Sequence, residues 1–333
     1  MSFFSSLEIE TYLEQKNNIG KIFPTTDSAK NILALLENEI DVLGIEKSLN
    51  SKVISIEKNE NLFTIIAGND FQKFISKNVI VSVGGMTYPA LGSDGSLYDI
   101  IQKFGHTIID PVPSAVPLVS KNVLSHMLQG VKIYLEVTSY VDNKKIKSDT
   151  NDVIFTQYGL SGSGILNISR DISIYINRFK GRHAEVSLNF FPNKTPDSAL
   201  HYLDAIWERH PEWTILNSLL GFIPIKVAQA LLEVINIYKN MVVKNFTQEQ
   251  KFNLISRLCD YRFKIIQTRG WNEAEFTAGG VKTSEIDSNL ESKKVKGLYF
   301  CGEIIDVDGD VGGYNISWAF CSGGSLNINS YRN

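Results

Sequence analysis

The residues in this sequence with the clearest capacity for chemistry are glycines that follow apolar segments. They form three clusters, VSVGGMTYPALGSDGS (81–96), FTAGGV (276–281) and LYFCGEIIDVDGDVGGYNISWAF (298–320). Glycine lets the backbone approach a ligand closely, and free N–H groups at a helix start attract anionic or electron-rich groups. An ordinary turn explains any one cluster equally well. Three clusters, each after an apolar strand, favour a ligand site.

The last cluster has the most specific arrangement of polar groups. The residues expected around the N-terminus of the final helix are Gly312, Gly313, Tyr314 and Asn315. Glu303 would end the apolar strand 297–303, and open α/β sheets bind ligands at the carboxyl ends of their strands. The sequence therefore predicts a site made of backbone N–H groups and one carboxylate.

The usual catalytic signatures do not occur. The five histidines show no HExxH spacing, so a zinc hydrolase is not expected. The residues around Ser161 are GLSGS, which misses GxSxG, and no GxxxxGK[ST] phosphate loop is found. His106 follows Gly105 at a position typical of a helix C-cap, whereas Cys301 and Cys321 lie in apolar stretches typical of buried thiols. No catalytic residue and no metal site are therefore assigned.

Composition and charge bound the class of protein. The chain has 333 residues, 43% apolar and 21% charged, which is typical of a globular protein of one or two domains. With 33 basic and 36 acidic residues the net charge is −3 and no basic block occurs, which disfavours nucleic acid as a partner. No apolar run reaches the length of a membrane span, and three cysteines without a CxxC pair disfavour a disulfide scaffold. We expect a cytoplasmic protein with a small-molecule substrate and neither a membrane nor a nucleic-acid partner.

The first hundred residues indicate a mixed α/β layer. A helix capped by Thr25 or Thr26 is expected to end at Gly44. Three β-rich segments follow, at 51–58, 61–68 and 71–83. The run NVIVSV in the last of them is nearly continuously apolar, as in a strand buried on both faces of a parallel sheet. A second helix is expected from about Ser96 to Phe104.

After Pro111 the pattern changes. Short alternating strands without a convincing long helix continue to about Phe191, which favours a small barrel or a curved antiparallel sheet. Four helical segments (197–207, 213–220, 226–238 and 248–258) and a strand (261–268) follow. The predicted domains are a first α/β part at 1–113, an insertion at 114–272 (β-rich at 114–193 and 258–272, helical at 195–257) and a closing α/β part at 273–333.

These motifs, in this order, resemble one known family. GLYFCGEIIDVDGDVGGYNISWAFCSG is similar to the closing signature of bacterial FAD-dependent flavoproteins related to aminoacetone oxidase and bile-acid reductases. GKIFPTTDSA, VIVSVGGMTYPALGSDGS, FTQYGLSGSGILNISRD and WNEAEFTAGGV match further segments of that family. The resemblance implies a Rossmann-like, three-layer FAD/NAD(P)-binding domain with an inserted β-barrel-like plus helical domain. It also implies hydride transfer through FAD to a small unsaturated or carbonyl substrate, with NAD(P)H as a candidate electron donor.

The resemblance implies roles for single residues as well. The backbone of Val53 would meet the adenine, Glu303 would face the ribityl chain, and Asp306 would either fix its loop or contact the cofactor. The helix N-terminus after Gly313 would approach the pyrimidine side of the flavin, where it stabilises negative charge. The implied cofactor-binding residues are Val53, Gly84, Gly85, Gly279, Gly280, Gly302, Glu303, Asp306, Gly312, Gly313, Tyr314 and Asn315.

Part of the family's pattern is not found. In the family a strand–GxGxxG–helix unit opens the chain and holds the pyrophosphate, and no GxGxxG occurs in this sequence. Gln157 and Ser163 also stand where relatives often carry histidine and proline. We therefore expect an incomplete, N-terminally truncated domain that self-associates through exposed sheet edges and purifies without FAD, whereas a chain extended by such a unit would purify yellow. Two interpretations stay open: an FAD-dependent oxidoreductase, and a non-enzymatic or cofactor-free remnant of one.

Overall fold

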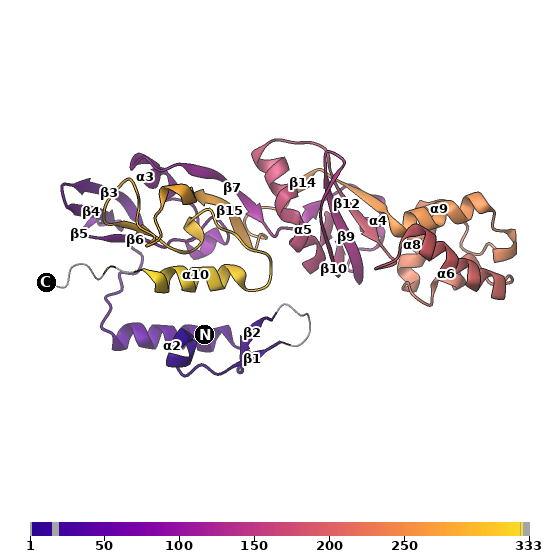
Figure 1. Ribbon diagram of the computed structural model, residues 1–333, viewed down its shortest axis with the longest axis horizontal. Helices are drawn as coiled ribbons and strands as arrows, with labels where there is room; N and C mark the ends of the chain where they lie inside the picture. Colours follow the sequence, from indigo (N-terminus) through magenta and orange to yellow (C-terminus); the bar gives the residue numbers. More distant parts are fainter. Residues whose placement is uncertain (1, 15–19, 327, 329–333) are drawn as a thin grey trace.

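The computed structural model describes residues 2–14, 20–326 and 328, and it is elongated (Figure 1). An N-terminal arm lies beside one end of the molecule, an α/β body forms that end, and an insertion with its own helices forms the other. The body and the insertion have separate hydrophobic cores. Among the described residues of the arm, Ile9 alone belongs to the buried apolar set.

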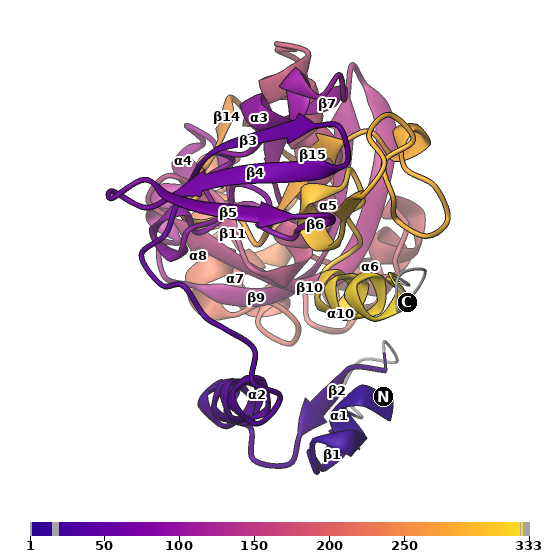
Figure 2. The same cartoon turned by 90° about the vertical axis from the view of Figure 1, so that its left-hand side faces the viewer.

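The arm consists of α1 (Ser2–Ser6), the hairpin β1 (Thr11–Leu13) and β2 (Ile22–Pro24), and α2 (Ala29–Val42). The cap of α2 is Ser28 rather than either predicted threonine, since its side chain accepts a hydrogen bond from the Asn31 N–H. No residue of α2 is buried, and Figure 2 shows the helix standing away from the sheets. The rings of Phe3 and Phe4 lie against Phe320 of the last helix, α10 (Tyr314–Ser325).

The body contains an antiparallel meander and a short parallel pair. The meander is β3 (Val53–Asn59), β4 (Leu62–Ala67) and β5 (Gln72–Ser76), and the parallel pair is β6 (Val79–Val81) with β16 (Leu298–Phe300). Because β6 and β16 come from opposite ends of the sequence, their pairing confirms the α/β layer interrupted by an insertion. Helix α3 (Tyr98–Lys103) packs its Ile100 and Ile101 into the core beneath this layer.

The predicted strand 71–83 is two strands in different sheets. Ser76 and Asn78 form a turn between them, with the Ser76 hydroxyl donating to the Asn78 carbonyl. The prediction that NVIVSV is buried on both faces was wrong, since Ile80 is 44% and Val83 is 40% exposed. The reason is that β6 pairs with β16 alone among the described residues, so one edge and part of one face lack cover.

The insertion is built on one antiparallel sheet of seven strands. The strand order is β13–β12–β9–β10–β11–β8–β14. The bounds are β8 (Leu118–Val119), β9 (Lys132–Val141), β10 (Lys144–Thr156), β11 (Gly159–Ser161), β12 (Ala184–Asn189), β13 (Tyr261–Ile265) and β14 (Gln267–Thr268). Its two edge strands are separated in the sequence by Ile266 alone, so the sheet must curl until its edges are close. No ladder between those edges closes a barrel within the described residues.

Helices cover this sheet and extend it. The small helix α4 (Val123–Met127) and the four helices of the far end, α6 (Pro196–Arg209), α7 (Ile215–Leu219), α8 (Ile225–Val234) and α9 (Gln248–Cys259), belong to it. Threonines cap three of them as N-caps, namely Thr195, Thr214 and Thr247. The expectation of no long helix before residue 191 was wrong, because α5 (Ser163–Ser173) continues as a π-helical turn, η2 (Ile174–Arg178). Many residues of α5 are small or polar, so its sequence resembles a loop, although its isoleucines recur at helical spacing.

Two strands join the parts. β7 (Ile108–Ser114) pairs antiparallel with β15 (Phe276–Val281), so the chain enters and leaves the insertion side by side. Short 3₁₀ turns complete the body and the far end: η1 (Pro89–Leu91), η3 (Val243–Asn245), η4 (Thr283–Glu285) and η5 (Gly302–Ile304).

Candidate functional site

The three glycine clusters meet at Glu303. Its Oε1 accepts a hydrogen bond from the Thr277 N–H at 2.6 Å, and its Oε2 accepts one from the Gly85 N–H at 3.1 Å. Thr277 extends the link, because its hydroxyl accepts from the Met86 N–H at 2.8 Å. One carboxylate of the third cluster therefore fixes the loops of the first and second.

Glu303 occupies an unusual electrostatic position. Burial raises the pKa of its carboxyl above the ordinary range, and the nearby Asp308 adds to that shift, although the N–H donors of Thr277 and Gly85 oppose it. The ribityl-facing role implied for Glu303 stays a prediction. In this chain its oxygens already serve the backbone of two loops.

Several of the singled-out glycines are required by the protein's own packing. A Cβ on Gly280 would come within 2.5 Å of the Ile304 carbonyl, and one on Gly279 within 2.7 Å of the Ile109 carbonyl. A Cβ on Gly85 would collide with Thr277, and one on Gly84 would lie 2.8 Å from Ser93 Oγ. These positions explain themselves without a ligand, since any larger residue would push strands or loops apart.

Gly313 is different because nothing fills the space beside it. Its φ is +91°, and an added Cβ would meet no atom within 4 Å. Helix α10 starts there without a side-chain cap, and the Asn315 amide instead bonds both backbone groups of Gly309. Tyr314 is 52% exposed. The N-terminus of a twelve-residue helix is thus open to a ligand.

The middle and the last turn of α10 are hydrogen-bonded to Gly302, just after the end of β16. The Gly302 N–H donates to Ser322 Oγ at 2.8 Å, and Trp318 Nε1 donates to the Gly302 carbonyl at 3.0 Å. Gly302 has a φ of +75°, which favours glycine. The strand end, the η5 turn and the helix therefore form one unit.

The insertion holds the loop between η5 and α10. Arg170 of α5 binds Asp308 with both Nε and Nη2, at 2.5 and 2.7 Å, and the Asp308 side chain is 3% exposed. Lys147 of β10 pairs with Asp310 at 2.5 Å. Asp306 donates its N–H to the Val281 carbonyl, and burial raises the pKa of its carboxyl. This backbone contact holds the loop whatever the side chain, so both roles weighed for Asp306 stay predictions.

Val53 lies apart from the other predicted residues, at the start of β3 in the meander. Its neighbour Lys52 reaches the first glycine cluster, pairing with Asp94 at 2.6 Å. Gln157 is exposed at the β10–β11 turn, and the Ser163 hydroxyl donates to Asn151.

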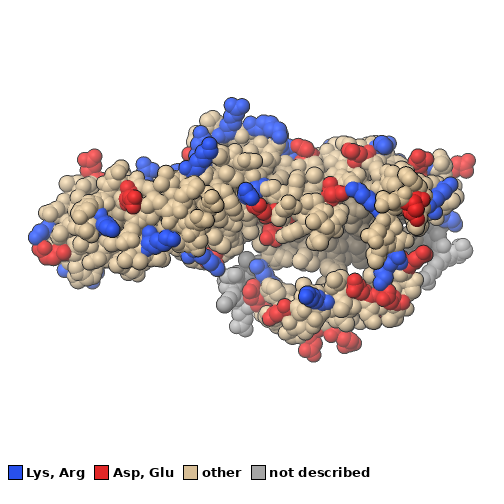
Figure 3. Space-filling model, turned by 180° about the vertical axis from the view of Figure 1, so that it is seen from behind, with Lys and Arg blue, Asp and Glu red and all other residues tan. Residues whose placement is uncertain are grey.

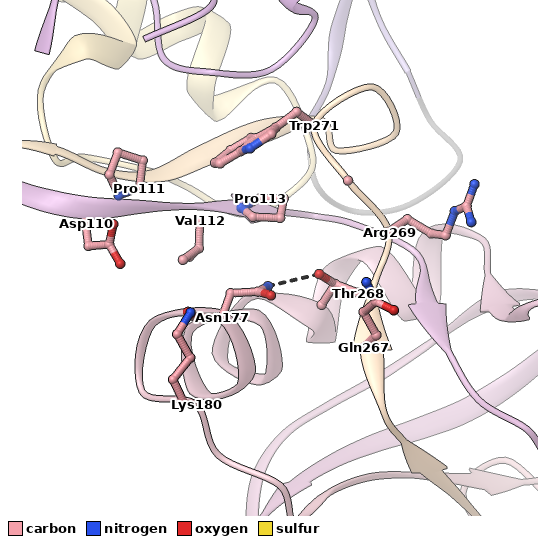
Figure 4. A pocket seen from close by; sticks show the side chains of 11 residues that line it. Asp110, Pro111, Val112, Pro113, Asn177, Lys180, Gln267, Thr268, Arg269 and Trp271 are labelled. Carbon is pink, nitrogen blue, oxygen red and sulfur yellow. Dashed lines mark hydrogen bonds between the residues drawn. The ribbon is translucent and has the colours of Figure 1, made fainter.

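Two cavities lie where the body meets the insertion. The larger, of about 350 Å³, contains no residue of the three glycine clusters. Figure 4 shows its side chains coming from β7, from the end of η2 and the residues after it, and from β14 and the segment that follows, with the Asn177 amide donating to the Thr268 hydroxyl. Its lining is Asp110, Pro111, Val112, Pro113, Asn177, Lys180, Gln267, Thr268, Arg269, Gly270 and Trp271.

The smaller cavity, of about 290 Å³, lies beside the first glycine cluster. Met86, Gly95 and Tyr98 line it, and it shares Asp110 and Pro111 with the larger one. The buried hydroxyl of Tyr98 has no hydrogen-bond partner in the described part of the chain. Burial raises its pKa, as do the charges of Glu303 and Asp306. Ser93 Oγ, also in the first cluster, is unpartnered too.

Sequence reasoning assigned His106 and one cysteine incorrectly. His106 does not cap α3: its ring is buried, with Nε2 2.7 Å from Ser292 Oγ and Nδ1 3.2 Å from Glu285 Oε2. Cys321 is exposed, whereas Cys301 is buried as expected. Among residues 2–14, 20–326 and 328, no group of three or more His, Cys, Asp or Glu side chains is placed to hold a metal ion, and no helix is long and apolar enough to cross a bilayer.

The residues of the body can be tested against FAD, the cofactor that the resemblance implies. The uncapped start of α10, with open space at Gly313, fits the electron-rich edge of a flavin ring. The sequence offers no GxGxxG turn for the pyrophosphate. The residues present therefore fit the ring end of the cofactor.

Comparison with known proteins agrees with this geometry. Residues 1–326 match the model of the HI0933-like protein Rossmann domain. A 3-dehydro-bile acid delta(4,6)-reductase of Clostridium scindens is 32% identical over 97% of this chain and 77% of its own length. Ribosomal RNA dihydrouridine synthases of Haemophilus influenzae and Escherichia coli are 29% and 30% identical, over 94% and 92% of this chain and 74% and 73% of their own lengths.

Among solved structures, Aquifex aeolicus GidA in the form I crystal covers 97% of this chain at 13% identity and a TM-score of 0.32, a score too low to argue from. This chain spans 56% of that one. The family match and the sequence relatives are sufficient to assign the chain to a family without this structure. The chain belongs to the HI0933-like Rossmann-domain family, and this family and its reductase relative point to an FAD-dependent oxidoreductase.

Proposed function

We propose that this protein takes part in the FAD-dependent reduction of a small unsaturated or carbonyl compound. The observation that carries the proposal is the convergence of three glycine clusters on Glu303, together with the open N-terminus of α10, which follows Glu303 in the third cluster. When bound, FAD supplies hydride transfer from its reduced ring, and NAD(P)H is the proposed source of the electrons.

The chain's own residues would hold the ring and shape the space next to it. Backbone N–H groups after Gly313 would bind the pyrimidine edge and favour its negative charge in the reduced state. Glu303 would keep the loops of Gly85 and Thr277 in place. Arg170 would hold the connecting loop through Asp308.

We place the substrate in the smaller cavity, against Met86 and Tyr98. Met86 is tied to Thr277 through its N–H, and the Tyr98 hydroxyl is a buried donor without a partner. That hydroxyl is shielded from solvent, so a ligand carbonyl oxygen would pair with it once the Tyr98 side chain shifts toward the cavity, and a buried hydroxyl left unpaired costs about 1–3 kcal/mol. A small carbonyl compound therefore matches this place.

The names of the relatives supply two substrates to compare, a 3-dehydro bile acid and ribosomal RNA. Both names describe reduction of an unsaturated ring. The net charge of −3 favours the small molecule over the polyanion. Bile-acid consumption with NADPH and FAD, measured against dihydrouridine formation in ribosomal RNA, separates the two.

The direct test is flavin binding, followed by the quenching of flavin fluorescence. We expect the 333-residue chain to purify colourless and to bind added riboflavin and FAD with similar weak affinity, because contacts would run through the ring. Gly313→Val should abolish this binding. A chain that binds neither flavin would be the cofactor-free remnant instead. A chain that purifies yellow would contradict the expectation about what holds the cofactor.

A further inference from the structure

We propose that two copies of this chain form a symmetric dimer. In it, α2 of each copy lies over β5 and over the free edge of β6 in the other copy. The inference is independent of the proposed function, because it rests on surfaces outside the glycine clusters. Four observations support it.

The first is an open sheet edge with apolar side chains. β16 is covered on its far side by residues 290–292, whose backbone bonds Leu298 and Phe300, but β6 has no second neighbour among the described strands. Ile80 on β6 is 44% exposed, and Ile75 on β5 is 60% exposed. Unpaired edges with apolar residues favour association.

The second is a helix, α2, that buries none of its residues. α2 has fourteen residues and none is buried, while Leu33 and Leu35 are 57% and 39% exposed. An isolated helix of about 12–15 residues is marginal in water and is normally stabilised by packing its apolar face. Helix α2, which has a good cap and no buried residue, is thus available to pack on a further surface.

The third is charge complementarity. Residues 1–50 hold eight acidic and four basic residues, whereas the remainder holds 28 acidic and 29 basic residues. Figure 3 shows the acidic side chains of the arm on the separate lower lobe. Glu37 and Glu39 of α2 form no ion pair in the described chain, and neither do Lys73 of β5 and Lys77 beside β6. These unpaired charges are opposite in sign across the proposed contact.

The fourth is the amount of surface. The chain exposes 18,868 Å², whereas a compact monomer of 37.3 kDa exposes about 13,700 Å². The excess of about 5,000 Å² exceeds what each chain contributes to an obligate homodimer, which buries about 2,000–5,000 Å² in total. The ten residues between α2 and β3 can span about 33 Å when extended, so the arm can reach a second molecule.

Charge reversal tests the arrangement. Glu37→Lys alone, or Lys73→Glu alone, places like charges at both contacts of a symmetric dimer. An equimolar mixture of the two variants places opposite charges at both contacts of the mixed dimer. Light scattering should therefore show a dimer for the unaltered chain, a tenfold or greater loss of dimer affinity for each variant, and recovery in the mixture.

A matched control is Lys226→Glu, which reverses an exposed charge on α8 at the far end of the molecule and should leave the dimer intact. Circular dichroism checks that each variant keeps its helix content. A monomeric unaltered chain at 50 μM (roughly 2 mg/ml) would overturn the proposal, and so would association that neither variant changes or a mixture that does not recover. A chain whose α2 packs on its own β5 and β6 would be a monomer in this measurement and would overturn the proposal as well.

Discussion

At the scale of single residues, Glu303 acts as a junction. Its two oxygens bind backbone N–H groups of Gly85 and Thr277, and the Thr277 hydroxyl accepts from Met86. Charge-assisted bonds of this kind are stronger than neutral ones. The arrangement makes the site stiff before any ligand arrives, because three loops share one set of donors and acceptors.

Thr277→Val tests this network. The substitution keeps the branched shape of a side chain that is 1% exposed but removes the acceptor for the Met86 N–H. Leaving that donor unpaired should lower the free energy of unfolding by about 1–3 kcal/mol. Hydrogen exchange at Met86 should accelerate as well. Thr277→Ser retains the acceptor and should keep Met86 protected, so equal exchange in both variants would contradict the assignment.

His106 predicts a pH dependence. Burial lowers the pKa of its imidazole below the ordinary 6.5, against the pull of Glu285. The unfolded chain therefore binds a proton that the folded chain resists. Stability is fully present above about pH 6.5 and falls as the pH drops, by at most about 1.4 kcal/mol per pH unit for one group. Urea midpoints at pH 7.5, 6.5 and 5.5 measure the slope, and His106→Gln should flatten it; an unchanged slope would assign the effect to other groups.

Glu303 and Gly313 could be singled out from the sequence because the motif places them at a strand end and a helix start. Arg170 and Asp308 could not be paired in advance. They are 138 positions apart, and Arg170 lies on a helix that was not expected, although Ile165 and Ile168 recur at helical spacing on it. The ring of His106 was misassigned because its partners, Ser292 and Glu285, are brought to it only by the fold of the body.

At the scale of elements, β15 is shaped by its glycines. Gly279 and Gly280 have φ values of +120° and +132°, and their missing side chains let β7 and η5 approach the strand. The pairing of β15 with β7 shows a register shift between Ala278 and Gly280, which is a bulge in the ladder. The glycine pair therefore determines how the connection to the insertion leaves the body.

Two glycine-to-alanine variants distinguish a glycine required by internal packing from one that leaves space for a ligand. Gly280→Ala should destabilise the fold by roughly 2 kcal/mol or more, since its Cβ would meet the Ile304 carbonyl at 2.5 Å in a strained conformation. Gly313→Ala adds a methyl in open space and should cost only about 1 kcal/mol from its positive φ. Thermal melts compare the two variants. Equal losses would mean that Gly313 also serves internal packing.

The elements that the sequence predicted best are those with a local cause. The meander strands and the capped helices α6 and α9 follow from alternation and from Thr195 and Thr247. The strand 71–83 was predicted as one piece because apolar residues that favour a strand stand on both sides of the short turn at Ser76 and Asn78. Its division into two sheets depends on β16, more than 200 residues away. Local sequence carries no information about that partner.

At the scale of the whole molecule, two cores are joined by few contacts. The insertion core draws on its sheet and helices, and the smaller body core draws on β4, β6, β16 and α3. The connections between them include the β7–β15 pair, the Arg170–Asp308 and Lys147–Asp310 pairs, and the bonds from Arg178 to the backbone of Asp110 and Ala278.

This asymmetry predicts unfolding in two steps. The body should unfold first, because its core is smaller and β6 lacks a second neighbour, whereas the insertion keeps a complete core of its own. Hydrogen exchange along a urea series should show residues 53–104 and 276–320 exchanging before residues 118–265. Removing Arg170, as in Arg170→Met, leaves the buried Asp308 carboxylate without its partner. It should destabilise the first step by less than the roughly 3–5 kcal/mol of a fully buried pair, because the Arg170 side chain is 42% exposed. The second step should not move, since its core contains neither residue. A single transition in which all segments exchange together would show that the joining strands couple the two cores more strongly than their contacts indicate.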